Sequence, residues 1–211
     1  MKMNLPNKLT VLRICLVPVI MAVGMLPSSI INFYVSCVIC AILFIGTSVT
    51  DMLDGKIARR DGLITDFGKF LDPVADKFMV IGTLFVILYK SDFAHIRTLI
   101  LFTLIIVVFR ELAVTSMRLV VSTGEGIVVA ANNLGKIKTV SQVVAISTVF
   151  LEPVVQLVAK LIYGAITSTT PVWRTDIIPL TWITLVFSLV MAVWSGVNYL
   201  KSYWKYLDPE K

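Results

Sequence analysis

The chain has 211 residues, of which 57% are hydrophobic and 15% are charged, and its formal net charge at pH 7 is +6. Soluble domains carry about 25% charged residues, and a globule of this size could not hide so much apolar surface, because folding leaves a large accessible shell. The composition therefore excludes a soluble enzyme, a disordered chain and a secreted disulfide scaffold. It favours an all-α integral membrane protein.

Six apolar stretches are long enough to be considered as membrane helices, since a hydrocarbon core of about 30 Å needs about 20 apolar residues per helix. The sequence predicts six transmembrane helices within a single domain, residues 1–211. The expected spans are residues 9–26, 30–50, 72–89, 96–119, 139–151 and 177–200. The fifth span is short and stops before Glu152 and Pro153, and the apolar stretch that follows, 154–166, is ambiguous.

Lysine and arginine are distributed unevenly between the two sides that this topology creates. Of the 19 basic residues, only Lys90, Arg97, Lys160 and Arg174 fall on the side away from the termini. Because cytoplasmic loops carry an excess of Lys and Arg, we expect a multi-pass protein of the cell membrane with both termini in the cytoplasm. The basic face suits the anionic headgroups of membrane lipids. The basic residues are dispersed over separate loops, so they do not indicate nucleic-acid binding.

Four aspartates flank the polar segment between the second and third expected helices. Asp51 and Asp54 are three residues apart at the end of one helix, and Asp72 and Asp76 are four apart at the start of the next. Residues at these spacings share a helix face, so two antiparallel helices can bring all four carboxylates together at one membrane face. Such a cluster must be partly protonated or neutralised by cations, and all-oxygen sites suit Mg²⁺ or Mn²⁺.

Small and basic residues follow the first aspartate pair. Gly55 and Ala58 lie about one turn further on and would let a flat ligand or a phosphate approach the backbone, and Arg59 offers a fork of donors suited to phosphate. This combination is typical of phosphoryl transfer, where positioning and charge neutralisation do most of the work. The alternative is a solvated loop whose acids and bases pair with one another, which we favour for Arg60, Asp61, Asp66 and Lys69.

The pattern D-x2-D-G-x2-A-R-x8-G-x3-D-x3-D runs through this segment, met by Asp51, Asp54, Gly55, Ala58, Arg59, Gly68, Asp72 and Asp76. It resembles the signature of the CDP-alcohol phosphotransferase family. The resemblance implies a six-helix membrane fold with a cytoplasm-facing metal and nucleotide site, two divalent cations (Mg²⁺ or Mn²⁺), a CDP-linked donor and a homodimer. It implies that Asp51, Asp54, Asp72 and Asp76 are metal ligands and that Asp76 is also the general base. The implied contacts of CDP-diacylglycerol are Gly55, Ala58, Arg59, Thr65 and Gly68.

Three further segments, residues 5–13, 110–118 and 135–139, resemble the branch of this family whose acceptor is glycerol 3-phosphate. A dianionic acceptor needs cationic partners, and the candidates in these segments are Arg110, Arg118, Lys136 and Lys138. Because the two lysines are two residues apart, at most one should reach the substrate. For Arg110 a structural ion pair with Glu111 is an equal alternative, and Arg13 could equally extend to the membrane surface.

The resemblance therefore implies transfer of the phosphatidyl group from CDP-diacylglycerol to sn-glycerol 3-phosphate, giving phosphatidylglycerophosphate and CMP. The nearest alternative is the same chemistry with phosphatidylglycerol, serine or inositol phosphate as the acceptor. An alternative of a different class is a divalent-cation transporter that uses the four aspartates as a permeation site. Their position at a helix–loop junction, away from the middle of the membrane, argues against transport.

Overall fold

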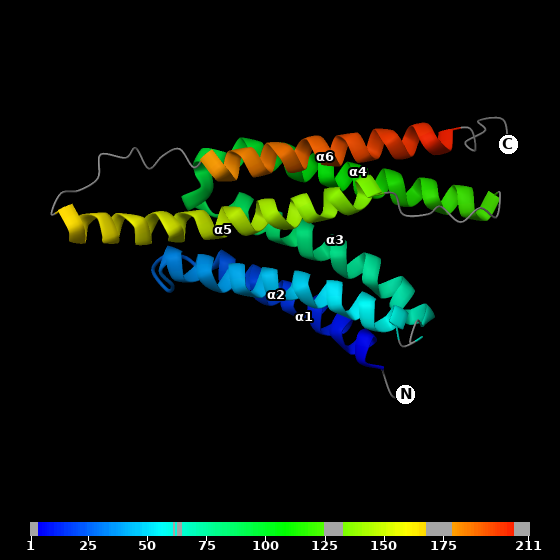
Figure 1. Ribbon diagram of the computed structural model, residues 1–211, viewed down its shortest axis with the longest axis horizontal. Coiled ribbons are helices and arrows are strands. Elements are labelled where there is room, and N and C mark those ends of the chain that lie inside the picture. The colour runs from blue at the N-terminus through cyan, green and yellow to red at the C-terminus, as the bar shows by residue number, and fades with distance from the viewer. Residues whose placement is uncertain (1–3, 61, 63–64, 125–132, 168–178, 205–211) are drawn as a thin grey trace.

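The computed structural model describes residues 4–60, 62, 65–124, 133–167 and 179–204 (Figure 1). The described residues contain helices and no strand, which confirms the all-α prediction. The long helices are α1 (Leu5–Met25), α2 (Phe33–Arg60), α3 (Asp66–Tyr89), α4 (Arg97–Gly124), α5 (Asn133–Thr167) and α6 (Pro179–Tyr203), and a 3₁₀ helix, η1 (Ser91–Ile96), leads into α4.

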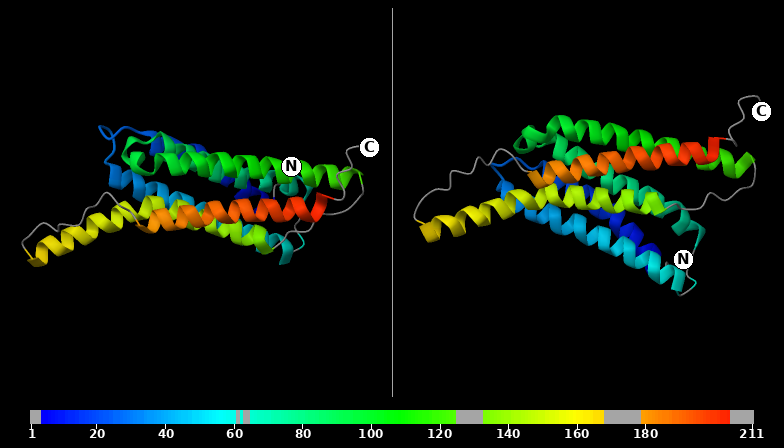
Figure 2. Two further views of the ribbon diagram at one scale, coloured as in Figure 1. Left: turned by 90° about the horizontal axis from the view of Figure 1, so that it is seen from above. Right: turned by 45° about the horizontal axis from the view of Figure 1, so that its top comes forward.

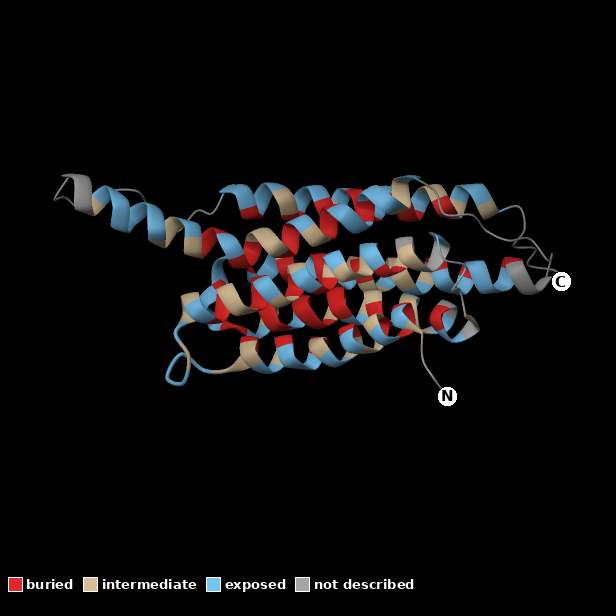
Figure 3. Cartoon of the chain, turned by 60° about the horizontal axis from the view of Figure 1, so that its bottom comes forward, coloured by how far each residue is buried: buried red, intermediate tan, exposed pale blue. Residues whose placement is uncertain are grey.

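Most of these helices are long and apolar enough to cross a membrane. The five stretches that qualify within the described residues are Leu5–Met25, Phe33–Gly55, Ser91–Val121, Asn133–Gly164 and Pro179–Tyr203. The remaining long helix, α3, carries Asp72, Asp76 and Lys77 in its first half. Many large apolar side chains are exposed, such as Ile42 at 64% and Phe109 at 72%. Exposed residues recur along the outer sides of the helices (Figure 3). Soluble proteins rarely expose such surfaces, so the chain is a helical membrane protein.

The six long helices form a closed ring. α1 packs against α2 and α3, α2 against α5, α5 against α6, α6 against α4, and α4 against α3 (Figures 1 and 2). α1 begins and α6 ends at the same end of the bundle, where α2 is followed by α3 and α4 by α5 (Figure 1). We call this end, marked by Leu5, Arg60, Asp66, Gly124, Asn133 and Tyr203, the polar end.

Glycines on α1 and α3 let these two helices approach each other closely. A Cβ atom on Gly24 would overlap Val86 Cγ1, and one on Gly82 would lie 3.1 Å from Val17 Cγ1. Val17 is fully buried. The two glycines therefore allow α1 to pack closely along α3. This packing places the polar residues in the first turns of α1 against the start of α3.

The fifth helix is longer than the sequence predicted. We expected it to end at residue 151, but α5 runs through Pro153 to Thr167, which gives it 35 residues. Proline removes one backbone hydrogen bond, a loss that membrane helices tolerate. Buried Glu152 ties this region to α6, because its Oε2 atom accepts from Thr181 N and Thr181 Oγ1, both at 2.7 Å. At about 1.5 Å per residue, α5 exceeds a hydrocarbon core, and its far end projects beyond the other helices (Figure 2).

The second helix is also longer than expected. α2 does not stop near residue 50 but continues to Arg60. Asp51 and Asp54 therefore lie within a helix and not at its end, which fixes their relative orientation more firmly than a loop would. The remaining expected spans agree with the structure to within several residues, except that 177–178 lie outside the described residues.

Candidate active site

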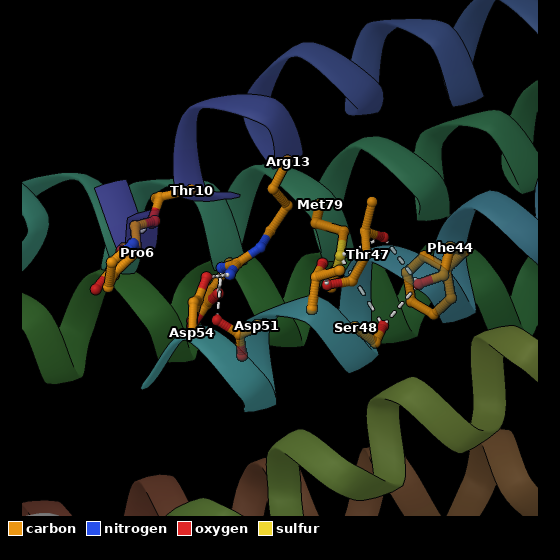
Figure 4. A network of polar contacts seen from close by, with 12 residues as sticks. Pro6, Thr10, Arg13, Phe44, Thr47, Ser48, Asp51, Asp54 and Met79 are labelled. Atoms are coloured by element: carbon orange, nitrogen blue, oxygen red, sulfur yellow. Dashed lines mark hydrogen bonds and ion pairs between the residues drawn. The ribbon is translucent and has the colours of Figure 1, made fainter. Parts of the chain in front are cut away.

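One arginine from α1 lies among three of the motif aspartates. The side chain of Arg13 is 0% exposed. Its Nη1 atom lies 2.5 Å from Asp51 Oδ1 and 2.8 Å from Asp76 Oδ1, and its Nη2 atom lies 2.6 Å from Asp54 Oδ2. Figure 4 shows Arg13 pointing toward Asp51 and Asp54. α1 therefore gathers carboxylates that α2 and α3 contribute separately.

The same face of α1 holds the start of α3. Thr10 Oγ1, one turn before the arginine, donates to Asp72 Oδ1 at 2.7 Å. One turn earlier still, Asn7 Nδ2 donates to Thr65 Oγ1 at 3.0 Å, and this hydroxyl accepts from Gly68 N, also at 3.0 Å, and caps α3. A Cβ atom on Gly68 would lie 2.9 Å from the Asn7 side-chain oxygen, so any larger residue here would displace the Asn7 amide. Residues at three-residue spacing on α1 thus position all four aspartates.

The aspartate cluster fits the divalent cations that the sequence motif implies. Within the described chain no three carboxylates converge on a common point as they stand, and the Arg13 guanidinium lies between three of them. One guanidinium cannot neutralise four carboxylates, so the cluster as it stands needs either bound cations or protonation of some carboxyl groups. The donor set is entirely carboxylate oxygen, which hard divalent cations prefer. The residues that would hold such cations are Asp51, Asp54, Asp72 and Asp76.

A cavity of about 1110 Å³ opens beside the aspartates, between α2, α3, α4 and α5. Asp51, Asp72 and Asp76 border it, whereas Asp54 does not. Side-chain exposure agrees with this difference, because Asp76 is 45% and Asp51 is 34% exposed, whereas Asp54 is 5% exposed. Further from the polar end the walls are mainly apolar and extend to Leu151. The cavity is therefore charged near the polar end and apolar deeper in the bundle.

The basic residues that the sequence assigned to the acceptor border this same cavity. Arg110 and Arg118 come from α4, and Lys136 and Lys138 come from α5. Glu111 accepts from Arg110 Nη1 at 3.0 Å and also pairs with Lys138. The ion pair that was the alternative for Arg110 is thus present, and its members still line the cavity. Lys138 is 7% exposed and Lys136 is exposed, but both border the cavity, so the expectation that at most one of them reaches the substrate stays a prediction.

α6 adds a residue that the sequence did not indicate. Arg118 Nη2 donates to the Tyr199 hydroxyl at 2.8 Å. The Arg118 and Arg110 guanidinium carbons lie 5.0 and 5.7 Å from the Tyr199 ring centroid, within cation–π range. Tyr199 is 3% exposed and borders the cavity. A lone tyrosine in an apolar helix gives no sequence signal for this role.

Three of the residues assigned to the CDP-linked donor lie beside the aspartates rather than in the cavity lining. Gly55 follows Asp54 on α2, and Thr65 and Gly68 lie at the start of α3. None of these three is among the residues that border the cavity. Ala58 and Arg59 belong to the last turns of α2, but their side chains lie outside the described residues.

The fold and the site define a helical membrane enzyme in which clustered carboxylates and clustered cations face one cavity. Residues 3–194 match the profile of the CDP-alcohol phosphatidyltransferase family. The chain belongs to this family, whose members generally use divalent metal ions.

Individual members of the family share substantial identity with the chain, and three of them carry the name CDP-diacylglycerol–glycerol-3-phosphate 3-phosphatidyltransferase, with the suffix 2 for the plant protein. The Bacillus subtilis (strain 168) protein is 45% identical over 155 residues, which cover 70% of this chain and 77% of the relative. The Arabidopsis thaliana protein is 31% identical over 215 residues, covering 97% and 81%. The Yersinia enterocolitica protein is 30% identical over 208 residues, covering 97% of both chains.

Proposed function

We propose that this chain transfers the phosphatidyl group of CDP-diacylglycerol to the 1-hydroxyl of sn-glycerol 3-phosphate, giving phosphatidylglycerophosphate and CMP. The observation that carries the proposal is the cavity that joins Asp51, Asp72 and Asp76 to Arg110 and Arg118. A phosphoryl-transfer centre and a dianion-binding wall then share one space. The names of the relatives support glycerol 3-phosphate as the acceptor.

The chemistry is a direct displacement. The acceptor hydroxyl oxygen attacks the phosphorus that bears diacylglycerol, the bond from that phosphorus to the CMP oxygen breaks, and Asp76 takes the hydroxyl proton. Its position supports this role, because its side chain is 45% exposed and borders the cavity. Two divalent cations, Mg²⁺ or Mn²⁺, held by the four aspartates would supply positive charge to the pyrophosphate and to the leaving CMP.

The cationic wall orients the acceptor. Arg110 and Arg118 lie together over Tyr199, which holds both guanidinium groups in one place, and Arg guanidinium groups bind phosphate oxygens through paired donors. The apolar inner part of the cavity and the lipid-facing surfaces are compatible with a donor whose acyl chains remain in the bilayer. We place the polar end in the cytoplasm of a cell-membrane protein, because most Lys and Arg residues belong to that side of the expected topology.

The test is a reconstituted assay with a panel of acceptors. Purified protein in lipid vesicles receives CDP-diacylglycerol, Mg²⁺ and glycerol 3-phosphate, serine, inositol phosphate or phosphatidylglycerol in separate reactions. We expect CMP release and a new lipid with glycerol 3-phosphate, and no CMP release without an acceptor. If another alcohol is turned over faster, the proposed acceptor is wrong, but the phosphatidyl-transfer chemistry stands. Cation flux without CMP release would instead support a transporter.

A further inference from the structure

Gln142 of α5 is a buried polar side chain that the chemistry above does not use. It is 2% exposed, and its Nε2 atom has no hydrogen-bond partner in the described part of the chain. Its neighbour Ser141 is also buried, but Ser141 Oγ donates to the Lys138 carbonyl at 2.7 Å. A buried amide donor without a partner costs free energy. An unpartnered group of this kind therefore calls for a ligand or another specific explanation.

The position of Gln142 indicates what such a ligand would be. It borders the same cavity as the aspartates and the basic residues. It follows Lys138 by four residues on α5, so the two side chains share a helix face, with Gln142 about 6 Å deeper in the bundle. It thus lies between the charged part of the cavity and the apolar walls. A group bound there lies next to the anion site, on its uncharged side.

We infer that Gln142 binds the acceptor by a hydrogen bond to the secondary hydroxyl of glycerol 3-phosphate. This inference rests on the proposed function. The acceptor phosphate is matched by the cations of α4 and α5, and the primary hydroxyl must face Asp76 to react. The secondary hydroxyl remains, and it complements a neutral amide, which can both donate and accept. The phosphate, the primary hydroxyl and the secondary hydroxyl of the acceptor are then each bound by the protein. The reacting oxygen is therefore held in one orientation, which lowers the entropic part of the activation barrier.

The experiment compares two acceptors. The first is glycerol 3-phosphate, and the second is 3-hydroxypropyl phosphate, which keeps the phosphate and a primary hydroxyl but lacks the secondary hydroxyl. For the unaltered protein we expect kcat/KM to be about 10- to 100-fold lower with 3-hydroxypropyl phosphate, because the buried amide then stays unpaired. In Gln142→Met, glycerol 3-phosphate should lose that advantage and the two acceptors should become nearly equal. The KM for CDP-diacylglycerol should stay the same.

Ser141→Ala is the matched control, since it removes a buried polar group of the same helix that does not border the cavity. It should leave the ratio between the two acceptors unchanged. Equal losses for both acceptors in Gln142→Met would make Gln142 structural, and a raised KM for CDP-diacylglycerol would assign it to the donor ester. Either result overturns the inference.

The unaltered protein provides a test even if the variant does not fold. If it uses both acceptors equally well, Gln142 does not recognise the secondary hydroxyl and the inference is wrong, although the proposed function stands. If it turns over neither acceptor while another alcohol reacts, the proposed acceptor is wrong and the inference fails with it.

Discussion

Arg13 of α1 and Asp54 of α2 form an ion pair with almost no access to solvent. Arg13 Nη2 and Asp54 Oδ2 are 2.6 Å apart, and the side chains are 0% and 5% exposed. Charged groups inside membrane helices are costly unless they are paired or functional, and Arg13 also contacts Asp51 and Asp76. The arginine therefore acts as a built-in counter-ion for the acidic cluster, rather than extending to the membrane surface.

The first prediction concerns this counter-ion. Arg13→Met leaves the buried Asp54 carboxylate without its ion-pair partner, and breaking a buried ion pair typically costs about 3–5 kcal/mol. We expect a lower unfolding temperature in detergent without divalent cations, and a larger rise on adding Mg²⁺ than for the unaltered protein, because the cations replace the missing charge. Arg97→Met, at the exposed start of α4 far from the cluster, is the control. If Mg²⁺ raises the unfolding temperature of Arg13→Met and of the unaltered protein by the same amount, Arg13 does not act as a counter-ion at the metal site.

The second prediction is metal dependence through the aspartates. Asp51→Asn, Asp54→Asn and Asp72→Asn should each nearly abolish CMP release while the protein still inserts in the membrane, because a neutral amide binds a hard cation poorly. Asp92→Asn, in the exposed part of η1, should remain active. The measurement is CMP release with and without EDTA. Turnover that persists in excess EDTA would exclude a metal requirement.

The third prediction concerns the base. Asp76→Asn should lower kcat by about 10²–10⁴-fold, the usual loss when general base catalysis is removed. Binding of CDP-diacylglycerol should suffer less, since the other three aspartates can still hold a cation. Labelled CMP should not exchange into CDP-diacylglycerol in the absence of an acceptor. Rapid exchange without acceptor would point to a covalent intermediate and contradict direct displacement.

The fourth prediction concerns the acceptor phosphate. Arg118→Ala should raise the KM for glycerol 3-phosphate by about 10-fold or more, since a hydrogen bond to a charged group contributes about 1.5–3 kcal/mol, and should leave the KM for CDP-diacylglycerol nearly unchanged. Tyr199→Phe keeps the ring under Arg118 but removes the hydroxyl that accepts its hydrogen bond. Its effect should be in the same direction and smaller, about 3- to 10-fold. Equal changes for donor and acceptor would place Arg118 in the scaffold.

The fifth prediction concerns orientation. Ser202, near the end of α6, and Ser91, at the start of η1, are both exposed and lie at opposite ends of the bundle. With Cys15, Cys37 and Cys40 replaced, Ser202→Cys should be labelled by an impermeant thiol reagent only after the membrane is opened, whereas Ser91→Cys should be labelled in intact cells. The reverse pattern would invert the topology.

The grouping of the four aspartates was predictable from the sequence, because its signal is local. Asp51 and Asp54 share one helix, Asp72 and Asp76 share the next, and the spacing within each pair is visible without any tertiary information. The helical fold was predictable for a similar reason, since apolar length alone identifies membrane spans.

The missing parts depend on contacts between distant segments. Arg13 is separated from Asp54 and Asp76 by 41 and 63 residues, and Tyr199 from Arg118 by 81. No periodicity within a helix reports such pairs, and an arginine near a helix end is equally compatible with a surface position. The fifth helix was cut short at residue 151 because proline usually ends a helix, while packing of Glu152 against α6 cannot be read from the sequence.

The place of Tyr199 has a consequence for the order in which the two halves of the site can form during synthesis. α1, α2 and α3 contain all four aspartates and the arginine among them, so the acidic half requires only the segment up to Tyr89. The proposed acceptor half requires α4 and α5, and its two arginines lie against the ring of a tyrosine from α6, which follows the other helices of the described chain. A growing chain therefore acquires its acidic centre early and the cationic side of the cavity last. The cavity that joins the two groups is complete only when the ring of helices closes.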